Sequence, residues 1–267
     1  MRLADKVAII VGAGQGPGEG MGNGRATALV FAREGAKILA VDIDLKSAEK
    51  TAAIVAENAG ECIAFEADVT KEATLKGAVD EVVRRWGRVD ILHNNVGLSL
   101  AGGDANPLEI TEAAFDKISA INLRGTIMAC KHALPVMRAQ RSGAIINISS
   151  IAAWATNYPT VAYKATKAGM IAYTQQIATQ NAEFGIRCNV ILPGLIDTPM
   201  AVDTRARTWG KTRAEVAAAR DARVPLRSKM GTAWDVANAA LFLASEEACF
   251  ITGVALPVDG GSSLLRE

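Results

Sequence analysis

Seven glycines at alternate positions from Gly12 to Gly24 constrain the fold of this chain more than any other feature. They follow an apolar run, Val7 to Val11, and they precede a segment of good helix formers that starts near Arg25. Neither a helix nor a strand tolerates glycine at this density, because glycine loses more backbone freedom on folding than any other residue. We therefore expect a loop between a strand and a helix, with backbone amides free to contact a phosphate group at the helix N-terminus.

The rest of the chain repeats this order of strand and helix. Short β-branched runs alternate with helical stretches, which is typical of βαβ crossovers in a parallel sheet. With 267 residues, of which 50% are hydrophobic, the chain fits one α/β domain spanning 1–267 better than two. The predicted strands are 7–11, 37–41, 62–65, 89–92, 144–148, 188–191 and 254–258, and the predicted helices are 25–35, 46–58, 71–86, 112–139, 162–184 and 233–244.

Composition argues against several classes of partner. The net charge of +1 is too small for a nucleic-acid-binding surface. The two histidines, His93 and His132, lie in no cluster with metal-ligand spacing, so we predict no metal site. The uncharged stretch 142–163 is too polar for a membrane span, and the first strand follows the N-terminus without a signal-peptide pattern. We therefore expect a cytoplasmic protein without a membrane partner, whose four widely spaced cysteines are reduced thiols.

Three polar residues indicate proton-transfer chemistry. Tyr163 and Lys167 are four apart in a stretch of good helix formers, so their side chains share one helix face. A nearby ammonium favours phenolate, which predicts that the pKa of Tyr163 falls from about 10 to about 7. Ser150 follows the apolar run 144–148, where a buried parallel strand delivers its hydroxyl to the carboxyl edge of a sheet. This combination predicts redox chemistry on a carbonyl or an alcohol.

Together with further landmarks, these residues resemble the short-chain dehydrogenase/reductase family over nearly the whole chain. The landmarks are the glycine turn 12–24, Asp68-Val69, Asn94 to Gly97, Asn122, the Ser150, Tyr163 and Lys167 set, Pro193-Gly194 and Val258 to Gly261. The resemblance implies a doubly wound parallel sheet of seven strands flanked by helices, a Rossmann fold with strand order 3-2-1-4-5-6-7. It also implies a nicotinamide cofactor across the carboxyl ends of the strands and a substrate lid at about 198–225.

Two alignments to the family compete within the glycine loop. The first takes Gly12, Gly16 and Gly18, which fit the family spacing literally. It would start the helix near Glu19, with three glycines in its first turns, each costing ~1 kcal/mol relative to alanine. The alternative takes Gly12, Gly22 and Gly24, because the family helix usually opens as Gly24-Arg25-Ala26 does here. We favour the alternative, which leaves an insertion at 14–20.

The identity of the cofactor depends on the end of the second strand. Asp42 stands where an acidic side chain accepts both adenosine-ribose hydroxyls and repels a 2′-phosphate, which predicts NAD. Asp44 competes for this role, or it starts the next helix. By resemblance Asp68 and Val69 meet the adenine, although the residues alone equally suit an N-cap at Asp68 before Lys71. The other implied cofactor contacts are Gly12, Gly22, Asn23, Gly24, Asn95, Val96, Gly97, Tyr163, Lys167, Pro193, Gly194, Ile196 and Thr198.

The implied reaction interconverts a secondary alcohol and a ketone. NAD⁺ accepts a hydride from the alcohol carbon while Tyr163 takes the hydroxyl proton. Ser150 holds the oxygen, Lys167 lowers the pKa of the phenol and binds the nicotinamide ribose, and Asn122 completes a proton relay. The expected substrate contacts are Ser150, Trp154, Tyr158 and Leu195, which favour an apolar or ring-shaped alcohol. The stretch from Arg205 to Arg227 contains seven Lys or Arg residues and two acids, so an anionic substrate is conceivable. A solvated lid helix is the simpler interpretation of these charges.

Rival functions remain on the same fold. An NADPH-dependent 3-oxoacyl (acyl carrier protein) reductase is the first, and Asp42 weighs against it. A non-catalytic NAD-binding redox-sensing module would not need the complete Asn122, Ser150, Tyr163 and Lys167 set. By resemblance, the helices at 112–139 and 162–184 pair with those of a second subunit, and the C-terminal segment 264–267 supports another contact, which predicts a homotetramer.

Overall fold

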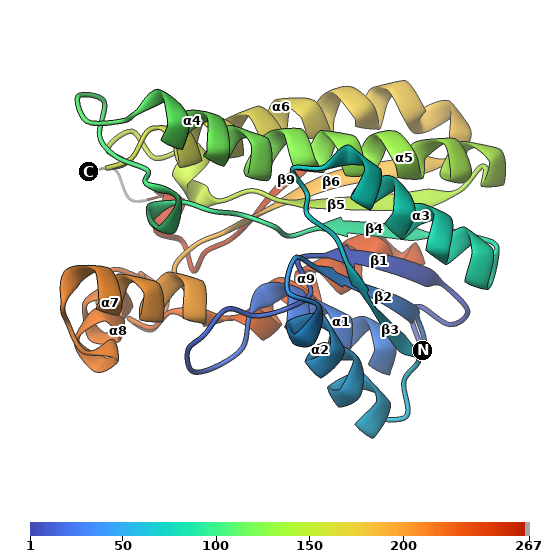
Figure 1. Ribbon diagram of the computed structural model, residues 1–267, viewed down its shortest axis with the longest axis horizontal. Coiled ribbons are helices and arrows are strands. Elements are labelled where there is room, and N and C mark those ends of the chain that lie inside the picture. Colours follow the sequence, from blue (N-terminus) through green and yellow to red (C-terminus); the bar gives the residue numbers. More distant parts are fainter. Residues whose placement is uncertain (265–267) are drawn as a thin grey trace.

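A seven-stranded parallel sheet forms the centre of the protein, and helices cover both of its faces (Figure 1). The structure is a computed structural model that describes residues 1–264. The strands are β1 Val7–Val11, β2 Lys37–Asp42, β3 Cys62–Glu66, β4 Ile91–Asn94, β5 Gly143–Ile148, β6 Ile186–Pro193, β7 Ile196–Asp197, β8 Gly231–Thr232 and β9 Ala255–Val258. The α-helices are α1 Asn23–Arg33, α2 Leu45–Glu57, α3 Glu72–Trp86, α4 Glu112–Ser119, α5 Gly125–Gln140, α6 Ala162–Asn181, α7 Thr204–Trp209, α8 Arg213–Asp221 and α9 Ala233–Ala244.

The strand order of the large sheet is β3-β2-β1-β4-β5-β6-β9, with all neighbours parallel. This confirms the predicted doubly wound sheet of seven strands. The winding reverses between β1 and β4, which are neighbours although two strands lie between them in the sequence. Ligands of such folds bind at the carboxyl ends of the strands beside this reversal.

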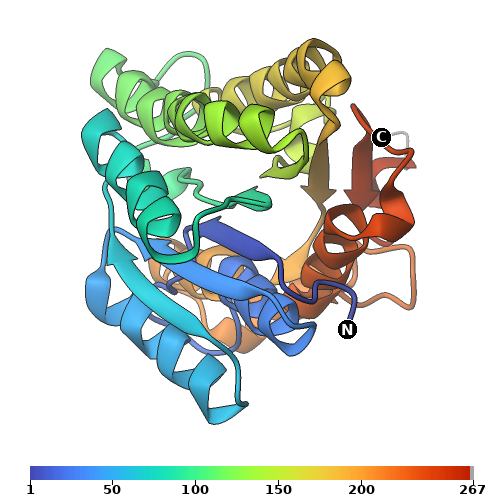
Figure 2. The ribbon, with the colours of Figure 1, turned by 90° about the vertical axis from the view of Figure 1, so that its right-hand side faces the viewer.

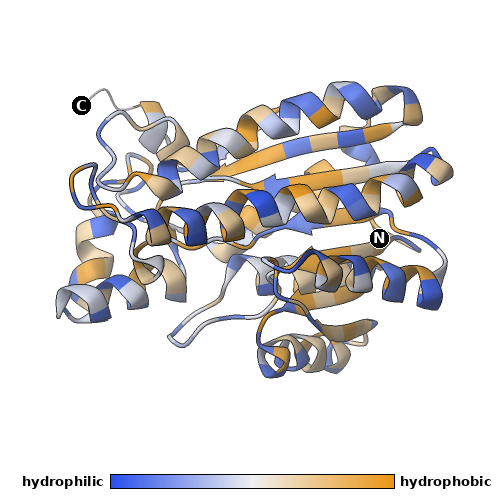
Figure 3. Ribbon diagram, turned by 45° about the horizontal axis from the view of Figure 1, so that its top comes forward, coloured by the Kyte–Doolittle hydropathy of each residue, from blue (hydrophilic) through white to orange (hydrophobic). Residues whose placement is uncertain are grey.

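The sheet is buried on both faces, which explains the continuous apolar runs in its strands. In β1 every residue is buried, and Ala8 and Ile10 join a core with residues of α1 and α9. Val7, Ile9 and Val11 point into a second core, which α3, α5 and α6 complete. Figure 2 shows the two helical layers above and below the sheet, and Figure 3 shows apolar strands between helices that are polar on their outer faces.

The predicted helix at 112–139 is helical from Glu112 to Gln140, with an irregular turn at Asn122. It is divided into α4 and α5 by a π-helical turn, Ala120–Arg124. Asn122 lies inside this turn and is fully buried, and its side-chain amide exchanges two hydrogen bonds with the backbone of Leu98, at 2.7 and 2.9 Å. One extra residue per turn is typical of functional sites in helices. The predicted helix 162–184 also ends earlier, at Asn181.

The segment 198–225, called the lid segment below, contains two helices, α7 and α8, where the sequence suggested a solvated lid helix without giving its bounds. A π-helical turn, Pro199–Asp203, precedes α7, and the short strands β7 and β8 pair where the segment leaves and rejoins the body of the domain. Val202, Ala206, Val216 and Val224 form a separate small core together with Met230.

The glycine loop follows the second of the two alignments. Helix α1 begins at Asn23 with Gly22 as its N-cap, so the extra residues at 14–20 form a loop in front of the helix. Gly24 packs so tightly that a Cβ atom there would lie 2.0 Å from the carbonyl oxygen of Gly12. Gln15 closes the loop, because its side chain bonds the backbone of Gly20 at 3.1 Å and of Gly22 at 2.8 Å.

The insertion at 14–20 contacts the lid segment, which lies almost two hundred residues away in the sequence (Figure 1). The backbone N–H of Glu19 donates to Asp203 at 3.1 Å, and a Cβ atom at Gly18 would lie 2.6 Å from the same carboxylate. Arg213 of α8 then binds both Asp203, at 3.5 Å, and Asp197, at 2.5 Å. The extra glycines therefore allow the loop to approach the lid segment closely.

The predicted homotetramer and the cytoplasmic location stay predictions. Residues 265–267, which belong to the segment expected to support a subunit contact, lie outside the described residues. Within 1–264, no helix is both long and apolar enough to cross a membrane.

The contact between Gly24 and Gly12 gives a test of the fold. We expect Gly24→Ala to destabilise the protein by about 1–3 kcal/mol, because the added methyl group overlaps a backbone oxygen that cannot move away cheaply. Gly16→Ala is the matched control, since a Cβ atom at Gly16 would meet nothing within 4 Å. Urea unfolding of both variants measures the difference. Equal stability of the two would contradict the close contact.

Candidate active site

A cavity of about 1780 Å³ opens at the carboxyl edge of the sheet. It extends from the end of β2 to the lid segment, and it brings together residues that the sequence singled out separately. Every predicted cofactor and substrate residue lines it, as do Ser150, Tyr163 and Lys167. Asn122 is the exception, because it is buried in the π turn behind the cavity wall.

The proton-transfer residues are held by contacts from separate strands and loops. The ammonium of Lys167 donates to the carbonyl oxygen of Ile148 at 2.6 Å and lies 5.7 Å from the centre of the Tyr163 ring. The Ser149 hydroxyl donates to the carbonyl oxygen of Lys167 at 2.7 Å, which ties α6 to the end of β5. A Cβ atom at Gly97 would lie only 3.3 Å from the lysine nitrogen, so the glycine at the end of β4 makes room for it.

Asp104 positions Tyr163, although the sequence analysis did not identify it. Its two carboxylate oxygens accept the backbone N–H groups of Ala162 and Tyr163, both at 2.9 Å. The carboxylate thereby caps the first turn of α6 from another part of the chain, where it is 7% exposed. No local sequence signal could have indicated this role, because the donor and the acceptor are almost sixty residues apart.

The expected lowering of the Tyr163 pKa is wrong for the protein by itself. Burial raises the pKa of this phenol to about 12, and the neighbouring Tyr158 adds to the rise, while Ser150 and the charge of Arg205 act in the opposite direction. Burial also lowers the pKa of Lys167 to about 7. Desolvation disfavours the charged forms of both groups, so the lysine is a weaker source of positive charge than its sequence position suggests.

At the other end of the cavity, Asp42 and Asp44 have different surroundings. Asp42 is half-buried and lines the cavity, and its oxygens accept the backbone N–H groups of Gly14 at 2.8 Å and Asp44 at 3.1 Å. Two carboxylate oxygens offer about four acceptor sites, so two remain for hydroxyl groups. Asp44 is exposed, lies outside the cavity lining and caps helix α2 through Ser47.

The alternative role of Asp68 as a helix N-cap is wrong. The N-cap of α3 is Lys71, and the Asp68 carboxylate instead accepts from the backbone and the hydroxyl of Thr70, at 2.9 and 2.7 Å. Those two bonds lower the pKa of Asp68. Asp68 and Val69 both line the cavity at the end of β3, where the resemblance places the adenine.

The glycine turn has the shape that a dinucleotide needs. Gly12 has a φ of +84°, and its carbonyl oxygen accepts a hydrogen bond from the side chain of Asn95 at 3.0 Å. The first N–H groups of α1 point out of the helix N-terminus and have no partner within the helix, which makes them donors for a phosphate. Glycine at positions 12 and 24 lets the turn pack closely, since a Cβ atom at Gly12 would lie 2.8 Å from Val96 and one at Gly24 2.0 Å from Gly12. The free N–H groups of α1 border the cavity beside this turn, so the residues present fit the phosphates of a nicotinamide dinucleotide.

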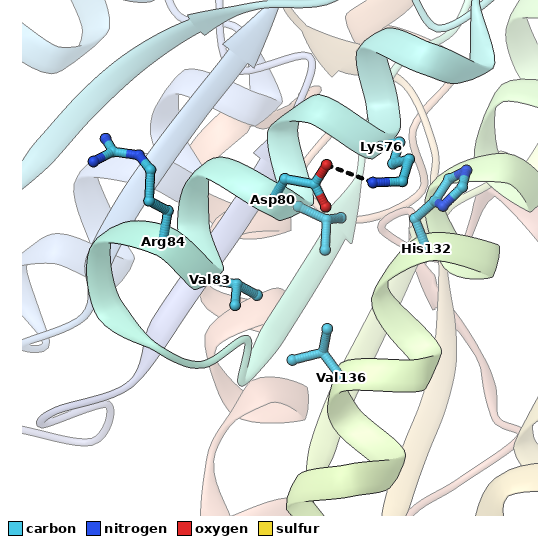
Figure 4. A pocket seen from close by; sticks show the side chains of 7 residues that line it. Lys76, Asp80, Val83, Arg84, His132 and Val136 are labelled. Carbon is cyan, nitrogen blue, oxygen red and sulfur yellow. Dashed lines mark hydrogen bonds and ion pairs between the residues drawn. The ribbon is translucent and has the colours of Figure 1, made fainter.

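A smaller hollow of about 400 Å³ lies between α3 and α5, on the outside of the helical layer (Figure 4). Lys76 and Asp80 form an ion pair at its rim, and Val83 and Val136 contribute its apolar floor. It contains none of the predicted site residues. Within 1–264, no group of three or more His, Cys, Asp or Glu side chains is arranged to hold a metal ion.

Comparison with known proteins identifies the family of this chain. The family model described as enoyl-(acyl carrier protein) reductase matches residues 18–263. Levodione reductase of Leifsonia aquatica is 35% identical over 98% of this chain and 96% of its own length. The 2-(R)-hydroxypropyl-CoM dehydrogenase of Xanthobacter autotrophicus is 34% identical over 96% of this chain and 97% of its own.

Solved structures show the same relationship. A Burkholderia xenovorans protein assigned to the short-chain dehydrogenases/reductases has a crystal structure that superposes with a TM-score of 0.90 at 42% identity, covering 100% of this chain and 99% of the other. The crystal structure of levodione reductase gives a TM-score of 0.91 at 34% identity, covering 99% and 100%. The chain belongs to the short-chain dehydrogenase/reductase family and is an oxidoreductase of that family.

The low pKa of Lys167 predicts a pH-dependent contribution to stability. Between about pH 7 and 10.5 an unfolded chain keeps the lysine proton and the folded protein does not, so stability rises with pH in this window. We expect Lys167→Met to reduce the slope of the unfolding free energy by up to about 1.4 kcal/mol per pH unit. Urea unfolding at several pH values between about 7.5 and 9.5 measures this slope. The range is chosen because it lies below the pH at which Tyr163 titrates in the folded protein.

Lys46→Met serves as the control for that measurement, because Lys46 is exposed on α2. Its slope should match that of the unsubstituted protein. A slope that Lys167→Met leaves unchanged would show that the ammonium keeps its proton in the folded state.

Proposed function

We propose that this protein is an NAD-dependent oxidoreductase that interconverts a secondary alcohol and a ketone. The observation that carries the proposal is the juxtaposition of Ser150, Tyr163 and Lys167 within one cavity that continues to Asp42. Relatives named levodione reductase and 2-(R)-hydroxypropyl-CoM dehydrogenase act on a ketone or an alcohol, as their names state. An assay that measures the formation of NADH from NAD⁺ by its absorbance tests the proposal. The substrates are panels of cyclic, aryl and sugar alcohols.

The side chains divide the chemistry among them. When bound, the dinucleotide supplies or accepts the hydride at the carbon of the substrate. Ser150 holds the substrate oxygen, and Tyr163 donates a proton to it during ketone reduction, for which a pKa of about 12 keeps the phenol protonated at neutral pH. In alcohol oxidation the phenol oxygen takes the hydroxyl proton, and positive charge beside the ring favours the phenolate that this step requires.

Asp42 supports NAD rather than NADP. Its carboxylate lines the cavity at the end of β2 with acceptor sites to spare, and a 2′-phosphate placed there would meet like charge. The guanidinium of Arg25, whose charge interacts with that of Asp42, lies outside the cavity lining, and its Nε donates to Thr51 at 2.9 Å. The cations that line the cavity within residues 1–264 are Lys167, Arg205, Arg207, Arg220 and Arg223, of which none belongs to β2 or α2.

A 3-oxoacyl-[acyl-carrier-protein] reductase is the second candidate function. A protein of this name from Thermotoga maritima is 34% identical over 98% of this chain and 99% of its own length. The same Ser150, Tyr163 and Lys167 would serve that reaction, so cofactor preference and substrate separate the two candidates.

The acid–base role of Tyr163 predicts how the removal of its hydroxyl group affects kcat. We expect Tyr163→Phe to lower kcat by at least about a hundredfold while NADH affinity stays nearly unchanged, because only the proton-transferring hydroxyl is lost. Tyr173→Phe makes the same change further along α6 and should leave kcat nearly intact. Retention of more than about a tenth of the activity by Tyr163→Phe would remove Tyr163 from this role.

Cofactor preference provides a second test. We expect the unsubstituted protein to disfavour NADP⁺ by at least ~3 kcal/mol in kcat/KM, more than about a hundredfold, because the phosphate meets like charge and the ribose loses its hydrogen bonds. Asp42→Asn keeps the shape and removes the charge, so it should narrow this gap. Asp44→Asn is the matched control, since it keeps a capping side chain for α2. It should leave kcat/KM unchanged for both NAD⁺ and NADP⁺. Equal use of both cofactors by the unsubstituted protein would reject the assignment of Asp42.

A further inference from the structure

The lid segment lines the cavity with positive charge. Four of its arginines, Arg205, Arg207, Arg220 and Arg223, belong to the cavity wall, whereas the acids of that wall, Asp42 and Asp68, lie at the opposite end. The space between Tyr163 and α8 is therefore bounded by guanidinium groups without an opposing carboxylate in the lining.

Arg220 is the most unusual of the four. It is only 9% exposed, and within residues 1–264 its guanidinium has one hydrogen-bond acceptor, the sulfur of Met230, at 3.3 Å from Nε. No carboxylate in the described part of the chain lies within 4.0 Å of it. Burial lowers the pKa of Arg220 to about 10. The like charges of Arg205 and Arg223 add to this effect and the charges of Tyr158 and Asp197 oppose it, and the group stays charged at neutral pH. A buried charge without a partner is costly.

The acids of the lid segment are bound elsewhere. Asp203 accepts from Glu19 and pairs with Arg213, and Glu215 closes the capping box of α8 with Thr212. Asp221 accepts the backbone N–H of Met230 at 2.8 Å. These three are all the acids between 198 and 225, so the segment satisfies Arg213 and leaves Arg220 without a carboxylate.

Arg205 extends the positive charge towards the reacting end. It is half-buried, its Nη1 donates to the carbonyl oxygen of Ala201 at 2.9 Å, and its guanidinium lies 6.0 Å from the centre of the Trp209 ring. Its charge lowers the pKa of both Tyr158 and Tyr163, against the larger rise that burial causes. Tyr158 and Tyr163 are stacked with their ring centres 6.1 Å apart. The two arginines and the acid–base phenol therefore face a common space.

We propose that Arg220 and Arg205 bind an oxyanion of the substrate, so that the alcohol or ketone taken by this site carries a carboxylate or a similar anionic group. The proposal rests on the proposed oxidoreductase function. A guanidinium presents paired N–H donors that match the two oxygens of a carboxylate, and the low polarity around Arg220 strengthens such a contact. The oxyanion would supply the partner that the folded chain does not, and it would fix the distance between the anionic end and the carbon that reacts at Tyr163.

The test compares hydroxy acids with their methyl esters. The panel consists of 3-hydroxybutyrate, mandelate and 4-(1-hydroxyethyl)benzoate, each beside its methyl ester, assayed with NAD⁺ for kcat and KM. The protein is used unsubstituted, as Arg220→Gln and as Lys211→Gln, which loses the same charge from an exposed position outside the cavity lining. A parallel calorimetric titration of the protein and NADH with 4-acetylbenzoate, and with its methyl ester, measures binding without turnover.

For at least one pair, we expect kcat/KM of the acid to exceed that of its ester by about tenfold or more. Arg220→Gln should bring this ratio close to one, mainly by raising KM for the acid. Arg220→Gln should lower kcat/KM for the acid much more than for the ester, and Lys211→Gln should behave like the unsubstituted protein. Equal use of acids and esters, or a ratio that survives Arg220→Gln, would overturn the anion site while leaving the proposed function in place. If no alcohol is turned over, the proposed function fails, and the calorimetric titration alone tests the anion site. Equal binding of 4-acetylbenzoate and its methyl ester would then reject the anion site. Phosphate and sulfate, titrated as competitors, distinguish a general oxyanion site from one that is specific for carboxylates.

Discussion

The removal of Lys167 from water is the constraint on which the rest of the site depends. Lys167 is 2% exposed and its ammonium bonds the backbone oxygen of Ile148, so its position requires β5, α6 and the end of β4 to be in place together. Ser149 fixes α6 against β5, and Gly97 leaves the space that the lysine occupies. A buried ammonium is tolerated only where the surrounding structure holds it, because desolvation disfavours its charge. The same burial explains why its pKa falls to about 7.

The end of β4 connects this proton-transfer site to the cofactor cradle. Asn95 bonds the carbonyl oxygen of Gly12, and Gly97, two residues later, packs against Lys167. Asn94, at the last position of the strand, bonds Asn147 of β5 at 2.9 Å. The distance between the glycine turn and the phenol is thus set by a few residues of one strand end. In an α/β sheet the carboxyl ends of neighbouring strands meet at one edge, which allows such a short connection.

The sheet and most of the site could be predicted because their signals are local. Strand and helix runs alternate, Tyr163 and Lys167 are one helical turn apart, and Ser150 follows an apolar strand. The remaining features depend on partners far away in the sequence. Asn122 sits in a π turn because its amide bonds Leu98, Tyr163 is fixed by Asp104, and the insertion at 14–20 approaches the lid segment through Asp203. The pKa of Tyr163 was misjudged for the same reason, since spacing reveals the neighbouring ammonium but not how strongly the fold desolvates it.

The charges of the cavity also bear on the pH dependence of the reaction. Burial keeps the phenol of Tyr163 protonated, and Arg205 is one of the groups that oppose this by lowering its pKa. An oxyanion bound between Arg205 and Arg220 would neutralise part of that positive charge. The pKa of Tyr163 would then return towards the value that burial alone dictates, because an anion near a phenol disfavours phenolate. An anionic substrate would therefore make the phenolate harder to form, so the oxidation of an alcohol, which needs a proton acceptor, would require a higher pH than it does for an uncharged substrate.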